Sequence, residues 1–379
     1  MNSRSAELFR LVLRSVITDT SVDLPEDFDL RVADVVSLAK SQDVLQLICH
    51  GIRNNAGILP EKAENERIME AYRFTNNGYT LKTAKQVLSD ARIPYVPLKG
   101  AVIKELDLYP EKWMRGSCDT DILIKEESLE RTIEALVAKG FVTDSRKEYH
   151  DVSLYFGGAH LELHFNICEN ICRVDRVLSH VWEYVEQVSE YEYREIPEFF
   201  IFHIIAHILY HFLRGGSNIK QYIDFWLLKK NRYYDEQKLM PFLRKCRLVE
   251  FYRVLSEATE AWFGEKEESV LSERIWNQVL RGGLANRQSN SDAISVYIGG
   301  GKLQYLFRSA FIPLREMKWY YPALEKRPYL LPVYYAKRLY SKTLGTDKTR
   351  AQKLLKVNTK KDSKQESDAI NLLSEMGLD

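Results

Sequence analysis

The sequence has few cysteines, almost no net charge and no long uncharged apolar run. Its five cysteines among 379 residues are too few and too scattered for a disulfide framework, and their odd number leaves one without a partner. A reducing compartment suits such a chain best. The 54 Lys and Arg residues nearly balance the 53 Asp and Glu residues, so the overall charge gives no reason to expect a nucleic acid or a membrane surface as partner.

The sequence also lacks the signals of export and membrane insertion. No window approaches 18 uncharged apolar residues, so no membrane-spanning helix is predicted. The first 25 residues mix Arg, Glu and Asp among the apolar side chains and lack the uninterrupted apolar core of a signal peptide. Together these absences predict a soluble, cytoplasmic protein.

The chain is long enough for two or three packed units, and its composition divides it into four parts. Helical periodicity dominates residues 1–90, short apolar runs alternate with helical segments in 91–190, and long helical segments return in 191–345. The polar and basic tail, 346–379, is predicted to be flexible, and its last stretch "ESDAINLLSEMG" could form one or two amphipathic turns. The predicted fold class is α+β and mostly helical, with a small mixed sheet flanked by N-terminal and C-terminal helical regions.

The stretch "DTDILI" carries the first candidate site. A strand has a side-chain period of two, so Asp119 and Asp121 point to the same face and could bind one cation. Mg²⁺ (or Mn²⁺) prefers oxygen ligands and binds through one or two carboxylates together with substrate phosphates. The alternative is a pair of solvated carboxylates at a strand end.

A third carboxylate follows in the stretch "HDVSLYFGGAHLELHFNI". The two adjacent glycines, Gly157 and Gly158, suit a tight hairpin turn. On the second strand of this hairpin, Glu162 and His164 point to the face opposite Leu161 and Leu163. Were this strand to lie beside the one with the aspartates, Glu162 would complete a trio of carboxylates able to hold two metal ions.

The stretch "VPLKG" precedes a segment that is predicted as a helix over 101–109, ended by Pro110. Gly100 permits close approach of the backbone to a ligand, and the amides after it could meet phosphate oxygens. Lys99 would add a positive charge, although it could equally be a solvated loop lysine.

In this order the motifs resemble an uncharacterised nucleotidyltransferase family of the polymerase-β superfamily. The resemblance rests on Leu98-Lys99-Gly100, Leu108-Tyr109-Pro110, Arg115, Asp119 to Ile124 and Glu162-Leu163-His164. It extends more weakly over about residues 30–345, where His207, His211 and Asp224 look like a recurrent pattern of the family. The interval from Gly100 to Asp119 is longer than is usual in the superfamily.

The resemblance implies a role for each matching residue. Asp119, Asp121 and Glu162 would be the catalytic residues and the ligands of Mg²⁺ or Mn²⁺, and Glu162 would help to deprotonate the acceptor. The implied nucleotide-binding residues are Lys99, Gly100, Arg115 and His164. His207, His211 and Asp224 would line the pocket.

Three other patterns are weaker. His203, His207 and His211 share a helix face at a spacing that some zinc sites use, but their apolar neighbours favour packing or pocket lining. A string of His164, Cys168 and Cys172 lacks a fourth zinc ligand. The stretch "IGGGKLQ" at 298–304 lacks two positions that a Walker phosphate loop requires.

The segment 326–364 is the one local basic patch, with twelve basic residues against two acidic ones and several interleaved tyrosines. An anionic partner such as RNA or a membrane face could bind there, and a solvated helix face followed by a basic tail is the simpler interpretation.

The sequence thus predicts a nucleotidyltransferase that moves an NMP from an NTP to an acceptor hydroxyl and releases pyrophosphate. The acceptor is open among a small molecule, a glycan, a protein and an RNA. Two alternatives remain: a binding or scaffold protein that keeps this fold without turnover, and an RNA-binding protein that uses the basic patch.

Overall fold

The fold is taken from a computed structural model. The structure describes residues 3–55, 59–116, 119–147, 150–284, 311–312, 314, 317–318, 321, 323–343 and 364–378. Within these ranges no helix combines the length and the apolarity needed to cross a membrane. Cys49, Cys168, Cys172 and Cys246 are free thiols, whereas Cys118 lies outside the described ranges.

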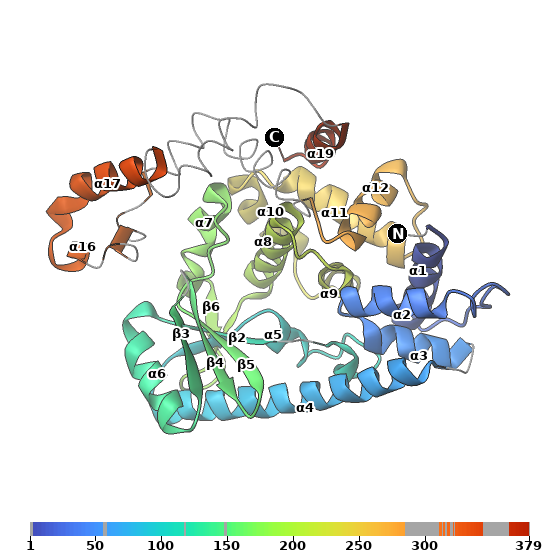
Figure 1. The fold of residues 1–379 in the computed structure, drawn as a ribbon, viewed down its shortest axis with the longest axis horizontal. Coiled ribbons are helices and arrows are strands. Elements are labelled where there is room, and N and C mark those ends of the chain that lie inside the picture. The colour runs from blue at the N-terminus through green and yellow to red at the C-terminus, as the bar shows by residue number, and fades with distance from the viewer. Residues whose placement is uncertain are drawn as a thin grey trace.

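The first part of the chain is helical, as predicted. Its helices are α1 (Ser3–Thr18), α2 (Val32–Ser41), α3 (Leu45–Asn55) and α4 (Glu61–Asp90). The first three pack against one another through apolar faces that recur every three to four residues. Helix α4 is 30 residues long and runs from this group of helices along the sheet (Figure 1).

The second part of the chain forms a five-stranded mixed sheet. Its elements are β1 (Tyr95–Pro97), α5 (Gly100–Ile103), η1 (Lys112–Met114), β2 (Asp119–Ile124), η2 (Glu126–Ser128), α6 (Leu129–Ala138), β3 (Val142–Lys147), β4 (Asp151–Phe156) and β5 (Ala159–His164). The strand order is β1-β2-β5-β4-β3, with β2 and β5 parallel and the other pairs antiparallel. Gly157 and Gly158 form the predicted β4–β5 turn with φ angles of 57° and 82°.

One prediction for this region was wrong. Helix α5 ends at Ile103 after four residues, whereas the sequence predicted a helix over 101–109. The chain then turns through Leu106 and Leu108, whose partly buried side chains pack against the helical core. Burial of these two leucines competes with continuation of a helix that is already too short to be stable alone.

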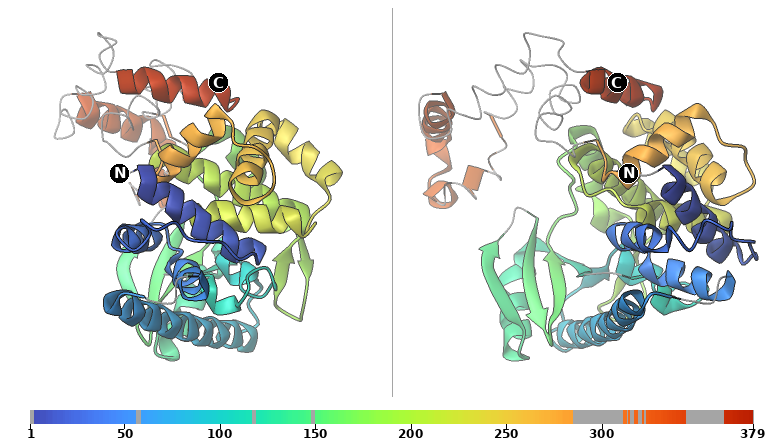
Figure 2. Two further views of the ribbon diagram at one scale, coloured as in Figure 1. Left: turned by 90° about the vertical axis from the view of Figure 1, so that its right-hand side faces the viewer. Right: turned by 45° about the vertical axis from the view of Figure 1, so that its right-hand side comes forward.

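The sheet separates its side chains cleanly. Ile122, Ile124, Leu161 and Leu163 face a core that α4 and α6 cover. Because the side-chain direction alternates along a strand, Asp119, Asp121, Glu162 and His164 point to the opposite face. That face looks toward the C-terminal helices (Figure 2).

The third part of the chain is again mostly helical. Its elements are α7 (Cys172–Leu178), η3 (Val181–Glu183), β6 (Val185–Gln187), β7 (Tyr193–Glu195), α8 (Pro197–Arg214), α9 (Ile219–Lys230), α10 (Glu236–Lys245), α11 (Val249–Phe263) and α12 (Val270–Leu280). Helix α8 starts at a proline and is buried on nearly all sides, as its apolar sequence requires. A capping box between Asn218 and Gln221 starts α9.

The described elements near the C-terminus are α16 (Ala323–Lys326), η4 (Pro328–Leu330), α17 (Leu331–Thr343) and α19 (Lys364–Glu375). The tail 346–379 was predicted to be flexible, except that its last stretch could form one or two amphipathic turns, and the structure has a longer helix there. There α19 buries Leu372 and Leu373 in the main helical core, because its leucines fall on one face. The stretch 298–304 and residues 344–363 of the basic segment lie outside the described residues.

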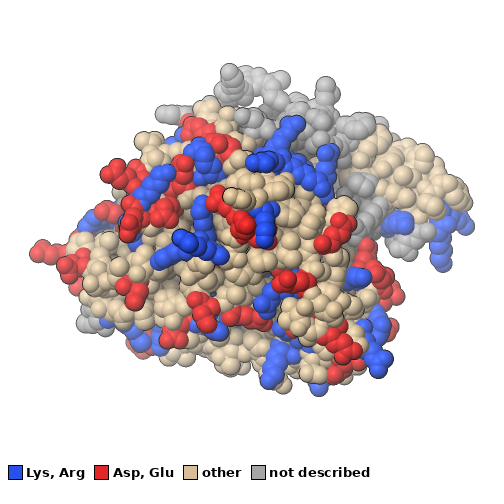
Figure 3. Space-filling view, turned by 180° about the vertical axis from the view of Figure 1, so that it is seen from behind, with Lys and Arg blue, Asp and Glu red and all other residues tan. Residues whose placement is uncertain are grey.

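Acidic and basic side chains are interspersed over the face seen in Figure 3, as expected for a chain of nearly zero net charge. The described part of the basic segment includes η4 and α17, with Tyr329 and Tyr340 exposed. An anionic partner for 326–364 stays a prediction.

Candidate active site

A cleft of about 330 Å³ lies between the polar face of the sheet and the helices α8 and α9. One wall comes from β2, β5 and the turn after β1, and the other comes from α8, α9 and the loop that follows β5. Asp43 of the N-terminal region also lines the cleft, so segments from three of the four predicted regions form it.

The strand pairing brings the predicted carboxylates together. Strands β2 and β5 are neighbours, and Asp121 is the register partner of Glu162. The ligand atoms of Asp121, Glu162 and His164 all lie within 4.8 Å of one another. The two carboxylates supply the hard oxygen ligands that Mg²⁺ and Mn²⁺ prefer. His164 Nε2 lies 2.8 Å from Asp121 Oδ1 and holds this carboxylate in place.

Asp119 lines the same cleft and lies on the same face of β2 as Asp121. It is half-buried and lies outside the close group of three ligand atoms. The close group in this structure is therefore Asp121, Glu162 and His164, and a metal site that includes Asp119 stays a prediction.

The charged side chains in this part of the cleft surround the carboxylate of Asp121. Burial alone would raise the pKa of Asp121, but the ammonium of Lys99, 3.8 Å away, and the imidazole of His164 hold it well below its usual range. Burial alone would lower the pKa of His164, but hydrogen bonds to Asp121 and Glu162 raise it to about 9. Two cationic side chains thus keep one buried carboxylate ionised, which is the state that a cation ligand requires.

The turn after β1 places Lys99 in the cleft. The backbone of Lys99 has a φ of 42°, which is strained for a residue other than glycine. Burial opposes the charge of its ammonium, but Asp121 and Glu169 outweigh burial and raise its pKa. A Cβ on Gly100 would collide with the guanidinium of Arg115, which explains why this position has no side chain.

The amides of this turn differ from their predicted role. The N–H groups of Ala101 and Val102 donate to the carbonyls of Leu98 and Lys99, at 2.9 and 3.1 Å. They are satisfied within the turn itself, because α5 closes into a single tight turn directly after Lys99. The ammonium of Lys99 is therefore the group of this turn best placed to meet phosphate oxygens.

Arg115 and Asp224 form a buried ion pair between the sheet module and α9. Arg115 donates to both carboxylate oxygens of Asp224, at 2.6 and 3.3 Å, and the hydroxyl of Tyr109 also donates to Asp224, at 2.6 Å. Burial disfavours the charge of Arg115, but Asp224 outweighs it and raises the pKa. This contact fixes the distance between the two walls of the cleft.

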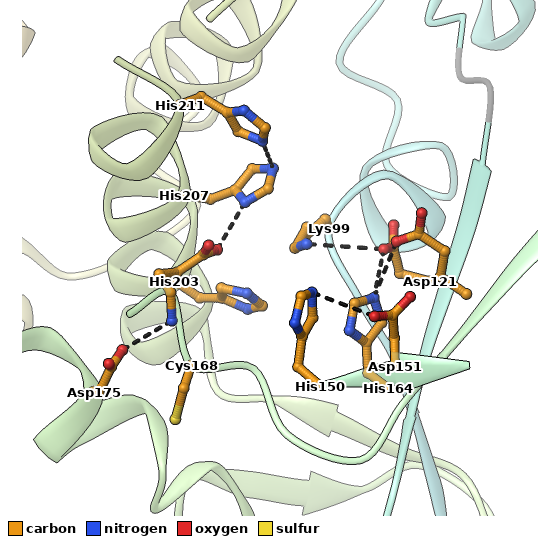
Figure 4. Close-up of polar contacts among 12 residues, drawn as sticks. Lys99, Asp121, His150, Asp151, His164, Cys168, Asp175, His203, His207 and His211 are labelled. Carbon is orange, nitrogen blue, oxygen red and sulfur yellow. Dashed lines mark hydrogen bonds and ion pairs between the residues drawn. The ribbon is translucent and has the colours of Figure 1, made fainter. Parts of the chain in front are cut away.

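The helical wall carries histidines, each with a polar partner. His203 Nδ1 lies 3.0 Å from Glu195, and His207 Nδ1 lies 2.8 Å from Glu169. His207 and His211 also contact each other through their Nε2 atoms, at 3.1 Å. Figure 4 shows these three histidines on one helix, opposite Lys99, Asp121 and His164.

Comparison with known proteins identifies the family of this chain. A family model described as an uncharacterised nucleotidyltransferase matches residues 29–264, which is more than half of the chain. The chain belongs to this family. No curated protein matched the chain, and no solved structure did. The matched range includes all the residues named in the cleft, so both walls belong to the nucleotidyltransferase region.

The structure brings all ten predicted site residues of this nucleotidyltransferase family member into one cleft. Those that line it are Asp119, Asp121, Glu162, Lys99, Gly100, Arg115, His164, His207, His211 and Asp224. Their individual roles stay predictions. Glu169 also lines the cleft and was missed, because a single glutamate in the loop after β5 matches no motif. Its position five residues after His164 in the sequence does not indicate a functional role.

Lys104 lies beside the cleft and provides a pH-dependent test. Burial, together with the nearby charges of Arg115 and Lys220, lowers its pKa from the usual 10.5 to about 7. Its ammonium lies 5.5 Å from the centre of the Phe74 ring. Between pH 7 and 10.5 the unfolded chain binds more protons at this lysine than the folded protein does, so stability rises with pH across that window.

We expect Lys104→Met to remove this dependence. At pH 7 the variant should be more stable than the wild type by about 2 to 4 kcal/mol, because the cost of burying a charge disappears. The difference should shrink steadily as the pH approaches 10. Urea unfolding at four pH values measures both quantities, and Lys82→Met on exposed helix surface serves as the control. A constant difference at all pH values would contradict the lowered pKa.

Proposed function

We propose that the protein transfers a nucleoside monophosphate from an NTP to an acceptor hydroxyl and releases pyrophosphate. The observation that carries this proposal is the register of Asp121 with Glu162, which places two carboxylates and His164 around one point in the cleft. Membership of the nucleotidyltransferase family supports the reaction class. In this proposal Asp121 and Glu162 hold Mg²⁺ or Mn²⁺, with Asp119 beside them.

A bound divalent ion would supply neutralisation of the charge that develops on the phosphates. The other roles belong to the chain itself. Lys99 steadies the triphosphate with an ammonium that Asp121 and Glu169 keep charged. His164 orients Asp121 through its 2.8 Å hydrogen bond. The Arg115–Asp224 pair holds the wall that carries Gly100 against α9, so the two reactants meet in a cleft of fixed width.

Nucleotide binding can be tested before the acceptor is known. A thermal-shift panel compares ATP, GTP, CTP and UTP, each with Mg²⁺ or with EDTA, on the wild type and on Asp119→Ala/Asp121→Ala. A nucleotide at a hundred times its dissociation constant should stabilise the wild type by about 2.7 kcal/mol. Glu130→Gln, an exposed carboxylate on α6, is the matched control and should respond like the wild type.

We expect one nucleotide to raise the melting temperature of the wild type and of Glu130→Gln, and to do so only when Mg²⁺ is present. The melting temperature of the double variant should stay unchanged. Equal shifts of the double variant would show that the aspartates do not bind the metal-nucleotide complex. The absence of any shift in the wild type would favour the scaffold or RNA-binding interpretation over turnover.

A further inference from the structure

One face of helix α17 is held by residues from earlier in the chain. The hydroxyl of Tyr335 donates to the carbonyl oxygen of Ile312 at 2.6 Å, and the ring centre of Tyr334 lies 4.6 Å from that of Tyr321. These contacts fix the rotation of the helix about its own axis. The opposite face of α17 is therefore the one that points away from them.

This opposite face is apolar and exposed. Tyr329, Val333 and Tyr340 are 72%, 61% and 64% exposed, and Ala336 is exposed as well. Within the helix, Val333, Ala336 and Tyr340 follow one another at spacings of three and four residues, so they lie on one side. Apolar side chains gathered on one exposed face indicate an interaction site. These four residues form the outer face of α17.

Positive charge accompanies the outer face. Residues 326–340 include four basic residues and no acidic one, and Lys326, Arg327 and Lys337 among them are exposed. The twelve basic and two acidic residues of 326–364 give a net charge of +10, whereas 42 basic and 51 acidic residues give −9 in the rest of the chain. An anionic surface therefore attracts the protein at this segment and repels the remainder.

The position of α17 makes its outer face accessible to a large partner. Figures 1 and 2 show α16 and α17 at the edge of the molecule, away from the sheet and from helices α1 to α12. In Figure 3, Lys and Arg side chains lie at the outer end of the part that contains these two helices. The exposed apolar side chains and the basic ones are thus presented together, at one end of the protein.

The composition of the outer face distinguishes between two anionic partners. Single-stranded RNA is bound by basic side chains along its backbone and by aromatic rings that stack on its bases, so aliphatic side chains such as Val333 contribute little. An anionic membrane uses both components, because cations meet the headgroups while apolar side chains enter the boundary between headgroups and acyl chains. Tyrosine suits that boundary, since its ring is apolar and its hydroxyl is polar.

We propose that the outer face of α17, together with Lys326, Arg327 and Lys337, binds the surface of an anionic membrane. The helix lies along the surface, with Val333 and the tyrosines at the level of the headgroups and the three cations against the lipid phosphates. This inference goes beyond the proposed function. It concerns where the protein is held, and it stands whether or not the cleft transfers nucleotides.

Vesicle flotation tests the proposal on the full-length protein. The vesicles contain phosphatidylcholine alone or phosphatidylcholine with about 30% phosphatidylserine. We expect the protein to float with the anionic vesicles only. Salt at about 1 M should weaken this binding, because the screening length falls to about 3 Å. Equal binding to both kinds of vesicle, or no binding to the anionic ones, would overturn the proposal.

The contribution of charge is tested with Lys326→Gln/Arg327→Gln/Lys337→Gln. Each Lys or Arg close to an anionic membrane contributes about a fivefold increase in binding, so the partition coefficient onto the anionic vesicles should fall about 100-fold. Binding within threefold of the wild type would show that these cations do not face the membrane.

The contribution of the apolar side chains is tested with Tyr329→Gln/Val333→Gln, which keeps every charge. The partition coefficient should fall at least about tenfold, because burial of apolar area in the membrane is lost. Unchanged binding of this variant would overturn the proposed contact. Tighter binding of the wild type to polyuridylate than to the anionic vesicles would assign the surface to RNA and overturn the proposal as well.

Two matched controls remove the same kinds of side chain from other exposed surfaces. Lys238→Gln/Arg244→Gln/Lys245→Gln removes three charges from α10, and Ile68→Gln/Tyr72→Gln removes an aliphatic and an aromatic side chain from α4. Both controls should bind the anionic vesicles within about twofold of the wild type, and circular dichroism should be unchanged for all four variants. A control that loses as much binding as its counterpart in α17 would contradict a specific membrane-binding face.

Discussion

Asp121→Asn should abolish turnover while the protein stays folded. The substitution keeps the size of the side chain and removes the charge that Lys99 and His164 balance. We expect kcat for pyrophosphate release to fall at least about a thousandfold, because stabilisation of phosphate charge by a metal contributes several kcal/mol to the transition state. Circular dichroism should show an unchanged helix content.

The stability of this variant is a second readout. Lys99 and His164 each lose a charged partner in a buried site, so the free energy of unfolding should fall by roughly 1 to 3 kcal/mol. Glu130→Gln should alter neither quantity. Turnover within threefold of the wild type would remove Asp121 from the metal site, whatever the stability of the variant.

Breaking the Arg115–Asp224 pair should produce the largest loss of stability. All atoms of this contact are buried, and Tyr109 shares the same carboxylate. Asp224→Leu leaves the guanidinium without a partner, and Arg115→Met leaves the carboxylate with Tyr109 alone. Removing one member of a buried pair typically costs about 3 to 5 kcal/mol, and we expect each variant to fall in that range. Urea unfolding measures it.

The double variant separates structure from nucleotide binding. Arg115→Met/Asp224→Leu buries two apolar side chains in place of the pair and should be clearly more stable than the sum of the single losses predicts. If the nucleotide still raises the melting temperature of the double variant, Arg115 acts by joining the two walls of the cleft. If this thermal shift is lost, Arg115 also binds the nucleotide, as predicted. Single variants that each cost under about 1 kcal/mol would contradict the importance of this pair.

Much of the fold was predictable because its signals are local. The alternation of β2 and β5 places polar side chains on one face, and two adjacent glycines set the β4–β5 turn. The length of α5 was not predictable, since burial of Leu106 and Leu108 against distant helices ends it. The docking of α19 on the core likewise depends on a surface formed by other parts of the chain.

In the candidate site, too, local features were predictable and long-range contacts were not. The in-register pairing of Asp121 with Glu162 could be expected from strands that lie side by side, and the family resemblance identified the remaining motifs. The partners of the histidines could not be predicted. Glu169 contacts His207, which lies 38 residues away in the sequence, and Asp224 contacts Arg115, which lies 109 residues away. Such contacts depend on how α8 and α9 dock against the sheet, which no periodicity in the sequence encodes.

Helix α4 has a consequence for any attempt to shorten the protein. At 1.5 Å per residue its 30 residues span about 45 Å, and Ala84, Val87 and Leu88 near its end belong to the core beneath the sheet. A fragment that begins at residue 91 would therefore expose the apolar underside of its strands to water. The smallest piece able to fold must therefore include α4, because the sheet module depends on this helix to cover its apolar face.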